Sequence, residues 1–186
     1  MKRLFDIVSA LAALLFFCLP IIIVALVVRL TSRGPVIYWS DRVGQRNKIF
    51  KMPKFRTMRV DTPVVATHLL PDARQFLTPV GSFLRKSSLD ELPQLWSVLR
   101  GDMSVVGPRP ALFNQDELVE LRTSYGVDKF VPGLTGWAQV NGRDELPIFE
   151  KVKLDVDYVN RQSFALDMKI IGRTVLKVLR RDDIAH

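Results

Sequence analysis

The chain has 186 residues, 48% of them apolar, and a net charge of +8; these values suit one folded domain with an appendage and exclude a disordered chain. Residues 1–60 hold 11 Lys and Arg against two acidic residues, whereas residues 61–186 hold 16 basic and 17 acidic residues. The positive excess therefore indicates a local partner at the N-terminal end and disfavours a protein coated in basic charge for nucleic acid.

Cysteine and histidine are too few for several common sites. The single Cys18 cannot form an internal disulfide, and His68 and His186 give with it no zinc-ligand spacing. No local motif supports a Ser-His-Asp triad at either histidine. The sequence also lacks the glycine-rich dinucleotide motif and the Walker phosphate loop.

Residues 7–28 contain no charge, and this run of 22 residues is long enough for a membrane helix. Pro20 interrupts it, and a kink is expected there because proline removes a backbone hydrogen bond. Basic residues flank both ends, and the positive-inside rule then places both ends in the cytoplasm. A helix that enters, bends and returns satisfies this rule, but membrane-spanning helices also tolerate proline, so both topologies stay open on these grounds.

The next elements suggest a small, helix-rich α+β domain without the alternation of a doubly wound sheet. Residues 36–40 and 49–55 read as two short strands around a turn at 44–48, the second broken by Pro53. Further along, we expect the following elements: a loop over 61–79, helices over 89–100 and 112–125, a short strand around 137–140, and a helix over 147–163.

Residues 167–181 alternate apolar and basic side chains at mostly helical spacing. A basic amphipathic helix suits an anionic bilayer surface, although an ordinary surface helix packed on its own core has the same pattern. The nearby apolar segment favours the interfacial interpretation.

Residues 84–110 contain most of the candidate catalytic side chains. Ser88 and Glu91 have the spacing of a capping box, so Glu91 could simply cap a helix. The same helix start, with Arg85 beside it, could instead attract phosphate. One of the two adjacent acids, Asp90 or Glu91, could then be a nucleophile that forms an acyl phosphate, and the other could hold magnesium.

Four further basic residues are candidates for phosphate binding. Arg109 lies between two prolines, which hold the backbone rigid and present its guanidinium as a fixed fork. Lys54 and Arg56 could line the same anion site or touch lipid headgroups. Arg143 follows a turn, and it could equally be a phosphate-binding residue or a solvated loop residue.

Asp155-Val156-Asp157 has the D-x-D pattern of some metal-dependent nucleotide-sugar transferases. On a helix the two carboxylates would be about 200° apart and could not chelate one metal ion. We therefore expect no metal site there.

Taken together, these stretches resemble the bacterial sugar transferase family, in the form of the small monotopic phosphoglycosyl transferases. The resemblance covers nearly the whole chain and is carried by KRLFD at 2–6, GPVIYWSDRVGQ at 34–45, KFRTM at 54–58, LRKSSLDELPQLWSVLRGDMSVVGPRP at 84–110 and PGLTGWAQVNGR at 132–143. It implies transfer of a sugar-1-phosphate from a UDP-sugar to polyprenyl phosphate, with release of UMP.

The resemblance also implies roles for individual residues. Asp90 would be the nucleophile of a covalent phosphosugar intermediate, Glu91 would hold Mg²⁺, and Arg85 would contact phosphate. Arg109 and Arg143 would serve substrate binding.

For topology, the resemblance implies a re-entrant helix over residues 1–31, broken at Pro20, and a catalytic domain over 32–186. The domain would lie on the cytoplasmic face of the bacterial inner membrane, with membrane lipids as partners and both helix ends cytoplasmic. Two alternatives are a catalytically inactive membrane scaffold for glycan-assembly enzymes and a membrane-tethered nucleic-acid binder. The near-neutral balance of residues 61–186 opposes the second.

Overall fold

The computed structural model describes residues 1–63, 73–142 and 146–180. It is a helix-rich α+β fold with two small sheets. The helices and strands, in chain order, are α1 (Lys2–Phe16), α2 (Cys18–Thr31), β1 (Ile37–Val43), β2 (Ile49–Phe55), α3 (Gly81–Lys86), α4 (Leu95–Arg100), β3 (Ser104–Val106), α5 (Asp116–Ser124), β4 (Gly133–Thr135), α6 (Trp137–Asn141), α7 (Ile148–Arg161) and α8 (Phe164–Arg180), with short 3₁₀ turns between several of them.

The apolar N-terminal segment forms two helices, α1 and α2, that meet at Phe17 with a bend of 63°. Pro20 lies in the first turn of α2, where its missing N–H costs little. Its ring would clash with the carbonyl of Phe16 in a continuous helix, so the break falls before Pro20 rather than at it. Among the described residues no single helix meets the length and hydropathy criteria for a membrane span, whereas this bent pair meets them together.

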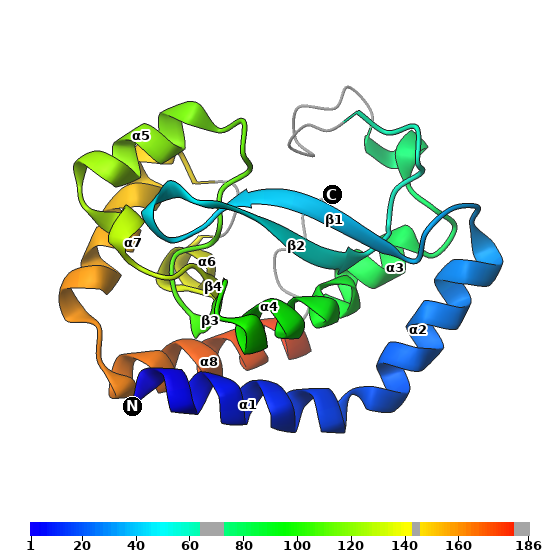
Figure 1. The fold of residues 1–186 in the computed structure, drawn as a ribbon, viewed down its shortest axis with the longest axis horizontal. Helices are drawn as coiled ribbons and strands as arrows, with labels where there is room; N and C mark the ends of the chain where they lie inside the picture. The colour runs from blue at the N-terminus through cyan, green and yellow to red at the C-terminus, as the bar shows by residue number, and fades with distance from the viewer. Residues whose placement is uncertain (64–72, 143–145, 181–186) are drawn as a thin grey trace.

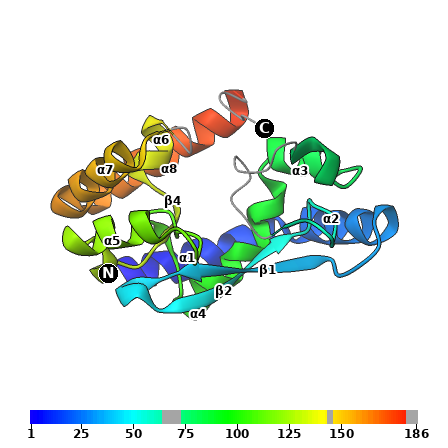
Figure 2. The same ribbon diagram turned by 90° about the horizontal axis from the view of Figure 1, so that it is seen from above.

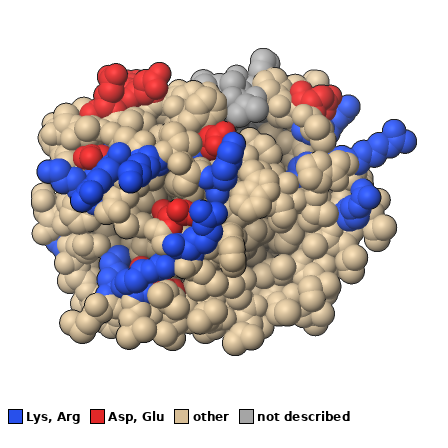
Figure 3. All heavy atoms as spheres, in the orientation of Figure 1, with Lys and Arg blue, Asp and Glu red and all other residues tan. Residues whose placement is uncertain are grey.

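One side of the pair packs on the rest of the chain. Ala10 of α1 is fully buried in a cluster with Val98 of α4, and Val24 and Val28 of α2 pack in a cluster with Phe55 of β2. The other side exposes large apolar side chains: Leu4, Val8, Leu11, Leu15, Phe16, Leu19, Ile22, Ile23, Leu26 and Leu30. In Figure 3 the lower margin, where Figure 1 places α1, is correspondingly uncharged surface.

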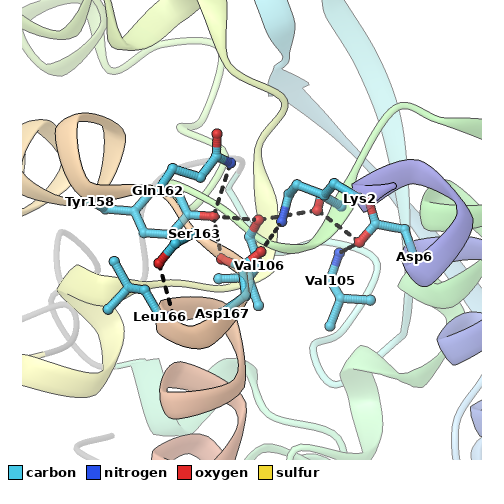
Figure 4. A network of polar contacts seen from close by, with 10 residues as sticks. Lys2, Asp6, Val105, Val106, Tyr158, Gln162, Ser163, Leu166 and Asp167 are labelled. Atoms are coloured by element: carbon cyan, nitrogen blue, oxygen red, sulfur yellow. Dashed lines mark hydrogen bonds and ion pairs between the residues drawn. The ribbon is translucent and has the colours of Figure 1, made fainter.

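A buried polar network fixes the first turn of α1 (Figure 4). Lys2 Nζ lies 2.6 Å from Asp167 Oδ2 of α8, and Asp6 Oδ1 accepts hydrogen bonds from Ser104 Oγ and Val105 N of β3, at 2.9 and 3.0 Å. Asp6 and Asp167 are both nearly inaccessible to solvent. Because removing one partner of a buried charge is costly, these contacts hold α1 firmly on the domain.

The predicted hairpin is confirmed as β1 and β2, which pair antiparallel from Ile37 with Phe55 to Val43 with Ile49. The prediction that Pro53 breaks the second strand is wrong, because Pro53 lies within β2 opposite Trp39. In a two-stranded ribbon each strand has an open edge, and proline is tolerated where its missing N–H faces that edge.

Several predictions for the middle of the chain were only partly correct or wrong. The helix expected over 89–100 starts as a 3₁₀ helix, Leu89–Gln94, and becomes α-helical only at Leu95. The strand expected around 137–140 is wrong, because these residues form α6 and the strand lies earlier, in β4. Strand β4 pairs in parallel with β3, a pairing the sequence did not suggest. Of the loop expected over 61–79, residues 64–72 lie outside the described part of the chain.

The three remaining helix predictions are confirmed as α5, α7 and α8. In Figure 2, α7 and α8 lie on the opposite side of the molecule from the hairpin and α4. Helix α5 lies nearer the end of the hairpin, where Asn47 Nδ2 donates to Thr123 Oγ1 at 3.0 Å. Ile170 of α8 is fully buried, whereas Val175, Leu176 and Val178 near its end are exposed. Helix α8 therefore packs on the domain through its first half and leaves an apolar surface on its second.

Candidate active site

Asp90 and Glu91 lie in the 3₁₀ helix Leu89–Gln94, directly after Ser88. Ser88 has a φ of 56°, a left-handed backbone conformation that is uncommon for residues other than glycine. Its hydroxyl makes no capping hydrogen bond, and the Glu91 carboxylate contacts other residues, so the capping-box interpretation is wrong. Pro93 lies inside this short helix, and the cations that act on Asp90 are the side chains of Lys54, Arg85 and Arg109.

Two cations hold the Glu91 carboxylate. Lys54 Nζ of β2 lies 2.7 Å from Glu91 Oε1, and Arg109 Nη2, from the turn after β3, lies 3.1 Å from the same oxygen. Burial alone would raise the pKa of Glu91, but Lys54 and Arg109 outweigh it and hold the pKa well below its usual range. Glu91 is therefore ionised throughout the physiological range.

The environment of Asp90, the residue directly before Glu91, shifts its pKa in the opposite direction. It is only 8% exposed. Burial raises its pKa to about 6 and Glu91 adds to the rise, whereas Lys54, Arg85 and Arg109 oppose it. The pKa values of these two adjacent carboxyls are thus shifted in opposite directions, a pattern found where two acids have different chemical roles. At pH 7 Asp90 is still mostly ionised, but it is a more basic carboxylate than an exposed one.

Arg85, at the end of α3, faces Asp90 and donates from Nε to Thr57 Oγ1 at 3.0 Å. Burial lowers the pKa of Arg85, and Asp90 opposes that change. Sequence reasoning missed Thr57, which is buried and joins α3 to the end of β2. Its place in the KFRTM stretch, beside Lys54, was the signal that could have identified it.

One predicted binding residue, Arg56, is not part of this group. The Arg56 guanidinium is buried and donates to the carbonyl oxygens of Ser32, Arg33 and Pro35, so it ties the end of α2 to the hairpin. These contacts give Arg56 a structural role rather than the predicted substrate contact. Arg143 lies outside the described residues.

The D-x-D residues of α7 have separate partners, as their helical spacing predicted. Asp155 is buried and accepts from Arg122 Nε and Nη2 at 3.0 and 2.6 Å, whereas the half-exposed Asp157 pairs with Arg161 one turn away at 3.1 Å. Burial raises the pKa of Asp155, and Arg122 opposes the rise. Sequence reasoning did not single out Arg122.

The donor set at Glu91 fits a magnesium ion that is bound together with substrate. Glu91 is ionised and both cations contact Oε1. Magnesium commonly uses one or two carboxylates and completes its shell with water and substrate phosphate oxygens. Over residues 1–63, 73–142 and 146–180, no three His, Cys, Asp or Glu side chains gather into a possible metal site. A site built from protein ligands alone is therefore not found in that part of the chain.

The arrangement joins a basic carboxylate with three cations. Lys54, Arg85 and Arg109 all act electrostatically on Asp90, and such a group suits an anion that carries several negative oxygens, such as a phosphate or diphosphate. A carboxylate held among phosphate-binding cations can attack phosphorus and form an acyl phosphate.

Comparison with known proteins finds matches over nearly the whole chain. The family model for bacterial sugar transferases matches residues 1–181. The uncharacterized sugar transferase EpsL of Bacillus subtilis is 44% identical over 99% of this chain and 90% of its own length. The UDP-glucose:undecaprenyl-phosphate glucose-1-phosphate transferase of Escherichia coli is 43% identical over 95% of this chain and 40% of its own length. The galactosyl transferase CpsE of Streptococcus agalactiae is 38% identical, with 96% and 42% covered. The chain thus spans most of the first relative but about two fifths of the other two.

Proposed function

The chain belongs to the bacterial sugar transferase family, as its motifs predicted, and on this premise we propose that it transfers a sugar-1-phosphate from a UDP-sugar to polyprenyl phosphate and releases UMP. The reaction proceeds by a ping-pong route through a covalent phosphosugar on Asp90. The name of the Escherichia coli relative, which specifies transfer of glucose-1-phosphate from UDP-glucose to undecaprenyl phosphate, supports this class of reaction.

One observation carries the proposal: the buried Asp90 carboxyl, with its pKa raised to about 6, lies among Lys54, Arg85 and Arg109 beside the ionised Glu91. Burial reduces the solvation that would otherwise weaken Asp90 as a nucleophile. The cations offset the charge of an incoming diphosphate, so an anionic substrate can approach an anionic nucleophile.

In the first half-reaction, an Asp90 oxygen attacks the phosphorus that bears the sugar. The bond from that phosphorus to the bridging oxygen breaks, and UMP leaves with the electron pair. The sugar phosphate is then held on Asp90 as an acyl phosphate. Arg85 and Arg109 stabilise the negative oxygens that surround phosphorus in the transition state.

In the second half-reaction, a phosphate oxygen of the polyprenyl phosphate attacks the same phosphorus. The bond to Asp90 breaks, the carboxylate is regenerated, and the product is a polyprenyl diphosphate sugar. One anion site can serve both phosphates in turn, because UMP has left before the lipid phosphate enters.

Glu91 would hold a magnesium ion together with substrate phosphate oxygens. When bound, the ion neutralises phosphate charge and makes the leaving UMP a better leaving group. Lys54 keeps the Glu91 carboxylate ionised and oriented.

The bent helix pair supports placement at a membrane surface. Lys2 and Arg3, at the start of α1, contact Asp167 and the carbonyls of Val98 and Leu99. The end of α2 is tied to the same domain by Arg56. Both ends of the pair therefore contact one domain, which favours a segment that enters and leaves on the same side of the bilayer. The basic flanks assign that side to the cytoplasm.

The reaction is tested by incubating the protein with UDP-sugars, undecaprenyl phosphate and Mg²⁺. We expect UMP as the released nucleotide, and its release should be lost in Asp90→Ala. UMP release that survives this substitution would remove Asp90 as the nucleophile. Release of UDP would indicate ordinary glycosyl transfer, and no release with any UDP-sugar would favour a non-catalytic scaffold.

The topology is tested by single cysteines at positions 2 and 35 in a Cys18→Ser background, labelled in intact cells with an impermeant reagent. We expect both positions to be protected until the inner membrane is permeabilised. Labelling of one position alone would mean that the segment crosses the bilayer.

A further inference from the structure

The turn that carries Arg109, residues 108–110, has prolines at both flanking positions and so has carbonyl acceptors but few N–H donors. Donors from elsewhere must hold it. Each of its three carbonyl oxygens accepts one hydrogen bond from a different element: Pro108 from Gly133 N of β4 at 2.9 Å, Arg109 from Arg122 Nη1 of α5 at 2.7 Å, and Pro110 from Arg42 Nη1 of β1 at 3.2 Å.

The middle donor is itself held in place. Arg122 is only 8% exposed, and its Nε and Nη2 donate to Asp155 Oδ2 of α7. The planar guanidinium thus has one edge on Asp155 and a third nitrogen on the Arg109 carbonyl. Guanidinium geometry is rigid, so fixing one edge also fixes the direction of the remaining N–H.

We propose that Arg122, oriented by Asp155, is a positioning residue for the reaction: it holds the backbone of Arg109 so that the Arg109 guanidinium reaches Glu91. The proposal rests on the proposed function, because it assigns the buried pair a role in the same site. It also gives a role to Asp155, which is buried on α7 and accepts from Arg122.

A series of contacts connects α7 to Glu91. Asp155 holds Arg122, Arg122 holds the Arg109 carbonyl, and the Arg109 side chain lies 3.1 Å from Glu91 Oε1. The flanking prolines limit the backbone freedom between the held carbonyl and the side chain. A loss at Arg122 therefore reaches the acids through Arg109, and it should have little further effect once Arg109 has been changed.

The test compares steady-state UMP release by Arg122→Lys and Asp155→Asn with that by Arg109→Gln. Lysine keeps the charge, but one ammonium group cannot reproduce the fork to both partners. We expect kcat/KM to fall about 10- to 100-fold in each variant, as is usual when residues behind a site are removed. The loss should divide between kcat and KM in the same way as in Arg109→Gln.

Asp157→Asn is the matched control, since it changes an acid of the same helix whose partner is Arg161; its kinetics should match the wild type. The double variant Arg109→Gln/Arg122→Lys should be no slower than Arg109→Gln alone. If Arg122→Lys does not fold, as judged by circular dichroism, Asp155→Asn replaces it in the cycle. Additive losses in an active protein would overturn the positioning role alone, whereas a wild-type protein that releases no UMP would overturn the proposed function and this inference together.

Discussion

Replacing Asp90 with asparagine should make the protein more stable at neutral pH while it abolishes the reaction. The folded protein raises the pKa of Asp90 from its ordinary 3.8 to about 6, mainly by burial. At about 1.36 kcal/mol per pKa unit, this difference corresponds to at most about 3 kcal/mol of destabilisation when Asp90 is ionised. Asparagine has nearly the same shape and never ionises, so it removes that cost.

The sign depends on pH in a specific way. Between the unfolded and folded pKa values the native state binds more protons than the unfolded state, so the wild type loses stability as pH rises through this window. The advantage of Asp90→Asn should therefore be at most about 0.6 kcal/mol at pH 4 and reach about 1–3 kcal/mol at pH 7.5. For a chain of this size, that gain is roughly 2–12 °C in Tm.

Denaturant unfolding in one detergent, followed by tryptophan fluorescence at pH 4, 6 and 7.5, measures this difference. Glu91→Gln is the matched control with the opposite sign, because the folded state lowers the pKa of Glu91 and so gains stability from its charge above the unfolded pKa. An Asp90→Asn protein that is no more stable than the wild type at pH 7.5, or equally stabilised at pH 4, would refute the assignment of a destabilised carboxylate.

Three further predictions concern the acids and the helix pair. Lys54→Gln removes the cation with the largest electrostatic effect on both acids, so the acid limb of UMP release, expected near pH 6 from Asp90, should move to higher pH; an unchanged limb would show that Lys54 does not control the pKa of Asp90. A chelator of divalent cations should stop UMP release and added Mg²⁺ should restore it, and activity that persists in the chelator would remove the metal role proposed for Glu91. Asp6→Ala leaves Val105 N without its acceptor and leaves Ser104 Oγ with the Val106 carbonyl alone, so it should lower the free energy of unfolding by about 1–3 kcal/mol; an unchanged denaturation midpoint would show that these contacts do not hold α1.

Much of the fold follows local signals in the sequence. Pro20 marked the break between α1 and α2, and the strand patterns around the turn at 44–48 located the hairpin. The pairing of β3 with β4 joins residues far apart in the chain and had no local signal. It depends on Gly133, where a Cβ would come within 2.0 Å of the Gly107 nitrogen. Without that pairing in view, residues 137–140 read as the strand.

The candidate site was predictable where its residues share a motif. Asp90, Glu91 and Arg85 lie within one dense stretch, and Arg109 stands out between its prolines. The sequence could not distinguish the role of Arg56 from that of Lys54, since the two lie in the same short basic stretch. Only the fold shows that the Arg56 guanidinium contacts the end of α2 and the residues after it. Arg122 and Asp155 were not recognisable as a pair, since Arg122 reads as an ordinary charge on its helix and Asp155 stood out only as part of the D-x-D pattern.

The covalent phosphosugar on Asp90 is the central claim, and intact-protein mass spectrometry tests it most directly. The protein is mixed with a UDP-sugar and Mg²⁺ in the absence of polyprenyl phosphate. We predict a mass increase equal to one sugar phosphate, located on the peptide that contains Asp90, with one UMP released per protein molecule. The adduct should disappear when polyprenyl phosphate is added and should not form in Asp90→Asn. UMP release that requires the lipid, with no adduct at any time, would contradict the account and indicate direct transfer between the two substrates.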